Sequence, residues 1–132
     1  AYVLFQIIGA IFGCLAANII FGLPVITIST HVRHDLSQFL SEILATFGLV
    51  LVIFLAREVA RQNIPILVGS YIASAYWFSS STSFANPAVT IARQFSDTFT
   101  GISPSGIPSF VLAQIFGAIL GYIVVQWLSR DM

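Results

Sequence analysis

The residues best suited to select a small molecule are Asn86-Pro87-Ala88, which follow a row of hydroxyl side chains from Ser79 to Ser83. Asn is a favoured helix N-cap and Pro is favoured at the first helical position, so we expect a helix from Pro87 to about Thr98. Such a helix is about 18 Å long, which is too short to cross a hydrocarbon core of about 30 Å. It is either a re-entrant half-helix that faces a water-filled path or an ordinary capped helix in a surface loop.

The small number of charged side chains excludes several classes of function. Only 8% of the 132 residues are charged and 58% are hydrophobic, whereas a soluble domain has about 25% charged residues. We therefore expect an integral membrane protein. Five arginines balance five acids, which leaves no basic surface for a nucleic acid. The sequence contains no nucleophile–base pair, phosphate loop or metal-ligand cluster, so we expect no enzyme, cofactor or metal.

Apolar stretches predict four membrane-spanning helices around the Asn86 segment. The first runs from Ala1 to about Ile28, with signals for a helix end at Gly22 and Pro24. The other three are expected over residues 36–56, 65–78 and 108–128. The chain begins within an apolar stretch and without a Met, so we interpret residue 1 as a truncation of a longer chain. Residues 1–132 are predicted to form a single transmembrane domain.

A short pattern occurs twice in the chain. Residues 6–13 read Gln-Ile-Ile-Gly-Ala-Ile-Phe-Gly, and residues 114–121 read Gln-Ile-Phe-Gly-Ala-Ile-Leu-Gly. Glycines at this spacing let membrane helices cross closely, and they are Gly9, Gly13, Gly117 and Gly121. The positive-inside rule places Arg57 and Arg61 in the cytoplasm, so that the two copies run in opposite directions. We predict an inverted repeat: residues 1–28 end its first half, and residues 36–132, with the half-helix near 87–98, form its second.

These features together resemble the aquaporin family, the major intrinsic proteins. The resemblance rests on Asn86-Pro87-Ala88, on the Gln-x-x-Gly-Ala-x-x-Gly helix after it, on the inverted repeat, and on residues 41–50, which are similar to the family's fourth helix. It covers the chain from the family's helix three to its helix six, without helix one, helix two or the first Asn-Pro-Ala loop. Residues 79–98 further resemble bacterial aquaglyceroporins linked to arsenic resistance.

The resemblance implies an all-α, aquaporin-like fold of four transmembrane helices and one re-entrant half-helix. It also implies a narrow pore in each monomer, a homotetramer in a lipid bilayer, residence in the bacterial inner membrane, and passive conduction of small neutral solutes or water. Asn86 would present its amide N–H to the permeant solute. The family's equivalent of Glu42 accepts hydrogen bonds from the loop before the half-helix, and we favour this supporting role for Glu42 over a proton relay.

The sequence departs from the family at the outer constriction, where an Arg usually follows the second Asn-Pro-Ala. Val89 occupies this position, and Ser74 and Ser83 match two further filter positions by their spacing from the motif. Small residues predict a wide, neutral filter. Arg93, one turn further on, either lines the pore or forms an ion pair with Asp97 at i+4.

A wide, neutral filter favours glycerol-like polyols, water and metalloid hydroxides such as arsenite or methylated arsenicals as the conducted solutes. The alternatives that remain open are a water-selective pore and a non-conducting structural membrane protein.

Overall fold

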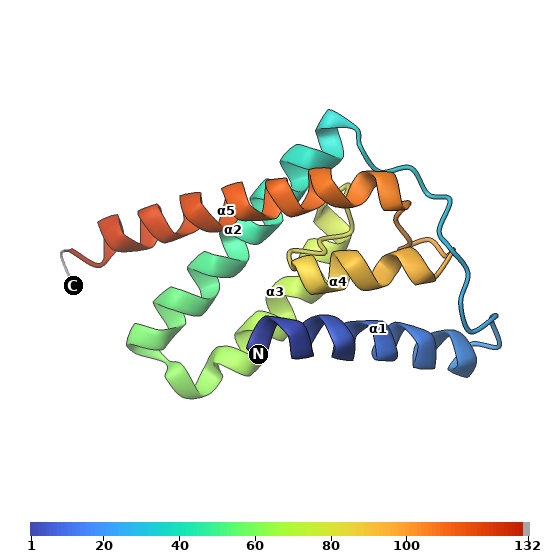
Figure 1. Ribbon diagram of the computed structural model, residues 1–132. Helices are drawn as coiled ribbons and strands as arrows, with labels where there is room; N and C mark the ends of the chain where they lie inside the picture. Colours follow the sequence, from blue (N-terminus) through green and yellow to red (C-terminus); the bar gives the residue numbers. More distant parts are fainter. Residues whose placement is uncertain (131–132) are drawn as a thin grey trace. The chain divides into compact units, whose positions relative to one another are not determined.

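The computed structural model describes residues 1–130, and this part of the chain is helical without strands (Figure 1). The residues cluster into two compact units. Unit 1 comprises Ala1–Asp35 and Asn86–Val111, and unit 2 comprises Leu36–Ala85 and the chain from Leu112 onward. The two units are described separately below.

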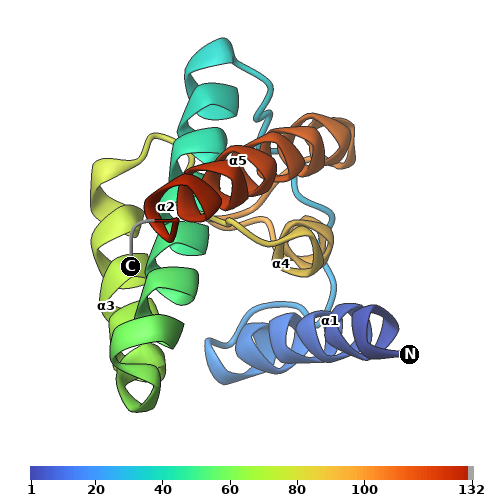
Figure 2. The ribbon, with the colours of Figure 1, turned by 90° about the vertical axis from the view of Figure 1, so that its left-hand side faces the viewer.

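Unit 1 pairs a long helix with a short one. Helix α1 spans Tyr2–Ile20, and helix α4 spans Pro87–Ala92. The two helices lie side by side (Figures 1 and 2). Helix α1 ends where the Leu23 N–H turns back to the Asn18 carbonyl oxygen at 2.8 Å, and Gly22 there has a φ of 69°. The first helix therefore stops at the Gly-Pro signal rather than at Ile28.

Unit 2 contains a pair of helices joined by a tight turn. Helix α2 spans Leu36–Val59 and helix α3 spans Ile64–Phe78, with the 3-10 turn Arg61–Asn63 between them. The two helices pack side by side (Figure 2). The Tyr71 hydroxyl of α3 donates a hydrogen bond to the Ala45 carbonyl oxygen of α2 at 2.9 Å. A Cβ on Gly48 would clash with the same tyrosine ring, so this glycine allows the close approach.

Helix α5, Ile107–Leu128, approaches α2 closely within unit 2. A Cβ on Gly117 would meet the Ile43 carbonyl oxygen, and one on Gly121 would lie 2.9 Å from the Phe47 carbonyl oxygen. Both glycines therefore allow backbone-to-backbone contact, which is the role that small residues have between membrane helices.

The two glycines of the first copy, Gly9 and Gly13, have more open surroundings than those of the second. A Cβ on Gly9 or on Gly13 would meet nothing within 4 Å. In the described part of the chain, these two residues therefore mediate no helix crossing.

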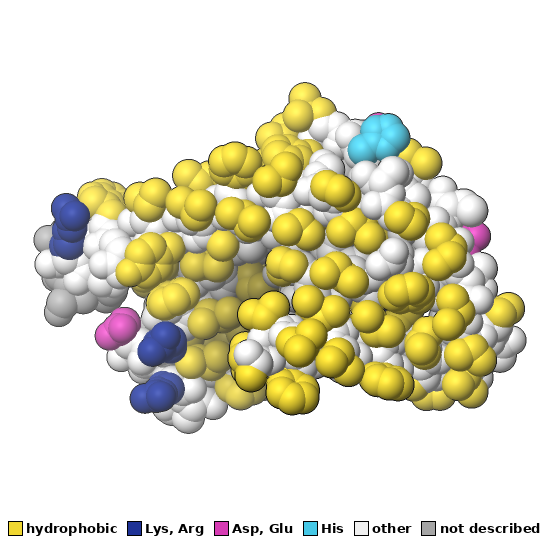
Figure 3. Space-filling view, viewed as in Figure 1, with side chains coloured by type: hydrophobic (Ala, Val, Ile, Leu, Met, Phe, Trp, Pro, Cys, Tyr) yellow, Lys and Arg dark blue, Asp and Glu magenta, His cyan; other side chains and the backbone are white. Residues whose placement is uncertain are grey.

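Within residues 1–130, three helical segments are long and apolar enough to cross a membrane: Tyr2–Ile20, Leu36–Val59 and Pro104–Leu128, which contains α5. The fourth expected span, α3, has 15 residues and is about 22 Å long, which is shorter than a hydrocarbon core of about 30 Å. Hydrophobic side chains cover much of the visible surface and charged ones are sparse (Figure 3). Trp77 is 84% exposed and Tyr2 is 76% exposed, as expected of side chains that face lipid or neighbouring protein.

The half-helix is shorter than the sequence predicts. Helix α4 ends at Ala92, residues Arg93–Phe95 form a 3-10 turn, and Ser96 is extended with a φ of −140°. The carbonyl oxygens that would continue the helix are used by other segments. They accept hydrogen bonds from Ile102 N–H (to Arg93), Ser29 N–H (to Gln94) and Thr27 N–H (to Phe95). Contacts with loops thus replace the last turn of the expected helix.

Candidate functional site

Asn86 starts α4 in the way that its sequence predicts. Its backbone is extended, with φ −157° and ψ 122°, and its side-chain Oδ1 accepts a hydrogen bond from the Ala88 N–H at 2.8 Å. Pro87 lies at the first helical position, where the missing N–H is not needed. Because Oδ1 is used by the cap, the Nδ2 group remains as a donor. Within residues 1–130 this group makes no hydrogen bond.

The loop before Asn86 has a strained backbone. Thr82, Ser83 and Ala85 have φ values of 63°, 49° and 48°, in the left-handed region that costs roughly 1–2 kcal/mol for a residue with a Cβ. All three residues are buried. A conformation of this kind persists only where surrounding contacts fix it.

Glu42 supplies those contacts from α2. Its carboxylate is fully buried. Oε1 accepts hydrogen bonds from Ser81 Oγ at 2.7 Å and Phe84 N–H at 2.8 Å, while Oε2 accepts one from Ala85 N–H at 2.9 Å. Hydrogen bonds to an ionised group are about twice as strong as those between neutral groups. The Glu42 carboxylate therefore binds the strained loop by three hydrogen bonds, and its supporting role in a pore stays a prediction.

Gln114 is a hydrogen-bond partner of Glu42 that the sequence analysis does not predict. Its Nε2 donates to Glu42 Oε2 at 2.8 Å, and its side chain is 2% exposed. Four donors thus converge on one carboxylate. The sequence signal for this side chain is the Gln that opens each copy of the repeated pattern.

Arg33 is a second residue that the sequence analysis missed. Although charged, it is only 5% exposed, and it donates to the carbonyl oxygens of Gly101 and Phe99 at 2.6 Å each. The Ser103 N–H also donates to the His31 carbonyl oxygen at 2.7 Å. These hydrogen bonds connect the loop after α1 to the loop after α4.

The Arg93–Asp97 ion pair is not formed, which corrects one of the two interpretations of these residues. Asp97 instead accepts hydrogen bonds from the Thr30 N–H at 2.8 Å and from the hydroxyls of Thr30 and Ser29. The α-helix ends before Arg93, so the i,i+4 spacing no longer brings the two side chains together. The hydrogen bond from the Thr30 N–H is the main cause that holds the pKa of Asp97 below its ordinary value.

The three expected filter residues belong to different units. Ser74 is exposed on α3 and donates to the Ser70 carbonyl oxygen, and Ser83 is buried in the strained loop; both lie in unit 2. Val89 lies on α4 in unit 1 and is half-buried. Their joint role as a filter stays a prediction.

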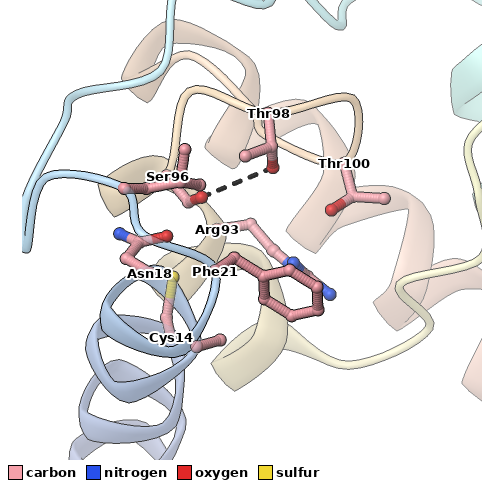
Figure 4. Close-up of a pocket in the computed structure, with 9 residues that line it drawn as sticks. Cys14, Asn18, Phe21, Arg93, Ser96, Thr98 and Thr100 are labelled. Atoms are coloured by element: carbon pink, nitrogen blue, oxygen red, sulfur yellow. Dashed lines mark hydrogen bonds between the residues drawn. The ribbon is translucent and has the colours of Figure 1, made fainter.

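Val89 and Arg93 share a cavity of about 200 Å³ in unit 1, which Gly13 and Cys14 of α1 also line. A neighbouring cavity of about 430 Å³ is lined by Arg93 and by residues of the two loops (Figure 4). The structure therefore places Arg93 beside both of these cavities, whereas Asp97 lines a different one of about 190 Å³.

Sequence comparison finds a curated relative that matches almost the whole chain. Over 130 residues it is 48% identical to the aquaglyceroporin AqpS of Rhizobium meliloti (strain 1021), in a match that covers 98% of this chain and 56% of that protein. By sequence, this chain is an aquaglyceroporin homologue. It spans about half the length of the curated relative that it matches. No protein-family model matches the chain, and no solved structure matches it significantly.

The match and the structure agree on the fold class. The aquaglyceroporin homologue is an all-α membrane protein with an aquaporin-like fold, as predicted. Its apolar helices support a membrane location.

Proposed function

We propose that this chain forms part of a passive membrane channel for small uncharged solutes. The observation that carries the proposal is the state of Asn86: Oδ1 is used by the helix cap, and the two Nδ2 hydrogens remain for a passing solute. Donors that are fixed in this way can replace part of the hydration shell of a neutral solute that carries hydroxyl or carbonyl oxygens. The named function of the relative, an aquaglyceroporin, supports the same class of solute.

The proposed solutes are glycerol-like polyols, water, and metalloid hydroxides such as arsenite or methylated arsenicals. Val89, Ser74 and Ser83 are small, and a filter built from them would pass molecules larger than water. The proposed assembly is a homotetramer in the bacterial inner membrane, with one pore in each monomer. Exposed apolar side chains such as Phe5 and Phe12 of α1 would then meet lipid or a neighbouring subunit.

Permeability measurements on the full-length protein in proteoliposomes test the proposal, with Asn86→Asp as the informative variant. Asp keeps an oxygen for the Ala88 N–H but removes both Nδ2 donors. We expect glycerol and arsenite permeability to fall roughly tenfold, the size of one lost hydrogen bond of about 1.4 kcal/mol. Asn63→Asp is the matched control, because Asn63 is exposed and its side chain forms no cap.

The alternatives give different results in the same experiment. A water-selective pore would pass water without glycerol, and a structural protein would leave both permeabilities at the level of protein-free liposomes. Equal glycerol permeability in the wild type and Asn86→Asp would contradict the role of the Asn86 amide.

A further inference from the structure

The larger cavity of unit 1 has two chemically different sides. It measures about 430 Å³ and lies between α1 and the chain that follows α4. Cys14 and Asn18 extend from α1, Phe21 follows the end of α1, and the hydroxyls of Ser96, Thr98 and Thr100 come from the loop after α4 (Figure 4). Ala17 and Leu23 complete the apolar side. The cavity can thus receive a molecule that has both hydroxyls and carbon surface.

Arg93 brings a positive charge to this cavity. Within residues 1–130 its guanidinium forms no hydrogen bond and no ion pair, and it lines both the larger and the smaller cavity. The nearest acid in sequence, Asp97, is occupied by Thr30 and Ser29. An ionised side chain in a membrane domain almost always faces water or an acceptor. Arg93 therefore requires water or ligand oxygens in the cavity.

The position of Arg93 is fixed by its backbone. Its carbonyl oxygen accepts the Ile102 N–H at 3.4 Å, and the next two carbonyl oxygens accept the N–H groups of Ser29 and Thr27. Asn18 adds a hydrogen bond from its Nδ2 to the Phe95 carbonyl oxygen at 3.0 Å. The 3-10 turn that carries Arg93 is therefore held from two sides, as required of a group that selects solutes.

We propose that Arg93 is a specificity-determining residue in a water-filled mouth of the pore, where its guanidinium binds acceptor oxygens of small uncharged solutes. The carbon side of the solute lies against Phe21 and Ala17, and its remaining hydroxyls meet Ser96, Thr98 and Thr100. This inference rests on the proposed channel function and deepens it. In this inference, Arg93, one turn beyond Val89, provides the positive charge at the entrance of the pore.

The thiol of Cys14 can report on access to the larger cavity, because Cys14 and Arg93 line both the larger and the smaller cavity. The experiment uses the full-length protein in proteoliposomes, treated with an anionic or a cationic methanethiosulfonate reagent of similar size. We expect Cys14 to react and the anionic reagent to be favoured. In Arg93→Gln that preference should fall roughly three- to tenfold, the size expected for one unit charge a few Å away in a wet site. Cys14→Ser identifies the labelled residue.

The charge-preserving variant Arg93→Lys should keep the preference for the anionic reagent, and Arg61→Gln, an exposed arginine in a loop, should not change it. A Cys14 that reacts only after denaturation would overturn the proposal, because the cavity would then be filled by protein. An unchanged reagent preference in Arg93→Gln would overturn it as well.

Solute flux in the same liposomes separates this inference from the proposed function. We expect Arg93→Gln to lower the ratio of glycerol to water permeability roughly three- to tenfold, because a charge-assisted hydrogen bond to the solute is lost. Arg93→Lys should retain most of the ratio. A wild-type protein that passes no glycerol refutes the channel function itself. A wild type that passes glycerol with the same ratio as Arg93→Gln refutes only the role of Arg93.

Discussion

At the scale of single residues, Glu42 is central to the local structure. Four donors converge on one buried carboxylate, and two of them are backbone N–H groups of a loop with three left-handed residues. A Gln at this position would offer one acceptor oxygen and one NH₂ group. The NH₂ group would face donors, so at least one of them would be left without an acceptor.

We therefore predict that Glu42→Gln destabilises the protein by about 1–3 kcal/mol for each donor left unpaired. The measurement is the thermal unfolding midpoint of the full-length protein in detergent, together with the yield of monodisperse protein. Glu58→Gln is the matched control, because Glu58 is exposed near the end of α2. A Glu42→Gln protein that unfolds at the wild-type temperature would show that the carboxylate does not hold the loop.

At the scale of secondary structure elements, the two copies of the glycine pattern have different surroundings. Gly117 lies against the α2 backbone, whereas a Cβ on Gly9 would meet nothing within 4 Å. The same substitution should therefore have different effects at the two positions. In the first copy it would fill open space, and in the second it would push α5 away from α2.

We predict that Gly117→Ala destabilises unit 2 by about 1–3 kcal/mol, the usual effect of overpacking. Gly9→Ala should be neutral or slightly stabilising, since Ala favours a helix by up to about 1 kcal/mol over Gly. Denaturation midpoints of the two variants, compared in one detergent, provide the measurement. Equal losses at both positions would mean that Gly9 also packs against protein.

The link between the two loops of unit 1 should depend on pH through Asp97. Its folded-state pKa is lowered, chiefly by the hydrogen bond from the Thr30 N–H, with additional help from nearby His31. A depressed carboxylate pKa contributes stability above the unfolded-state value of 3.8, and this contribution is lost as the pH falls through the folded-state pKa. Asp97→Asn lacks this contribution at every pH.

The expected result is a gap in unfolding midpoint between the wild type and Asp97→Asn that stays constant from neutral pH to about pH 4 and then narrows. The measurement is a series of thermal unfolding curves of both proteins across this range. A gap that keeps its neutral-pH size well below the unfolded-state pKa would contradict the role of the Thr30–Asp97 hydrogen bond.

The sequence predicts the local features of α4 well, but it predicts poorly which distant segments contact this helix. The start of α4 follows from Asn86 and Pro87, because capping is a local interaction. Its end does not, because the carbonyl oxygens of residues 93–95 are taken by donors from distant loops. For the same reason the contacts of Arg33 and Gln114 could not be read from the sequence: their partners lie 66 to 72 residues away.

At the scale of the whole molecule, the family resemblance and the all-α membrane fold are confirmed. The roles of the glycines, Glu42 and Asn86 in a pore, and the wide filter, remain predictions. The chain spans about half the length of its relative.

Val89 gives the most direct test of the proposed wide filter and solute class. The measurement is the permeability of the full-length protein to glycerol and to water, side by side for the wild type and Val89→Arg in proteoliposomes. We predict that the wild type passes both, and that Val89→Arg lowers glycerol permeability more than water permeability, because a larger charged side chain narrows the filter. A wild type whose glycerol permeability equals that of protein-free liposomes would contradict the account, as would a Val89→Arg protein whose two permeabilities fall equally or not at all.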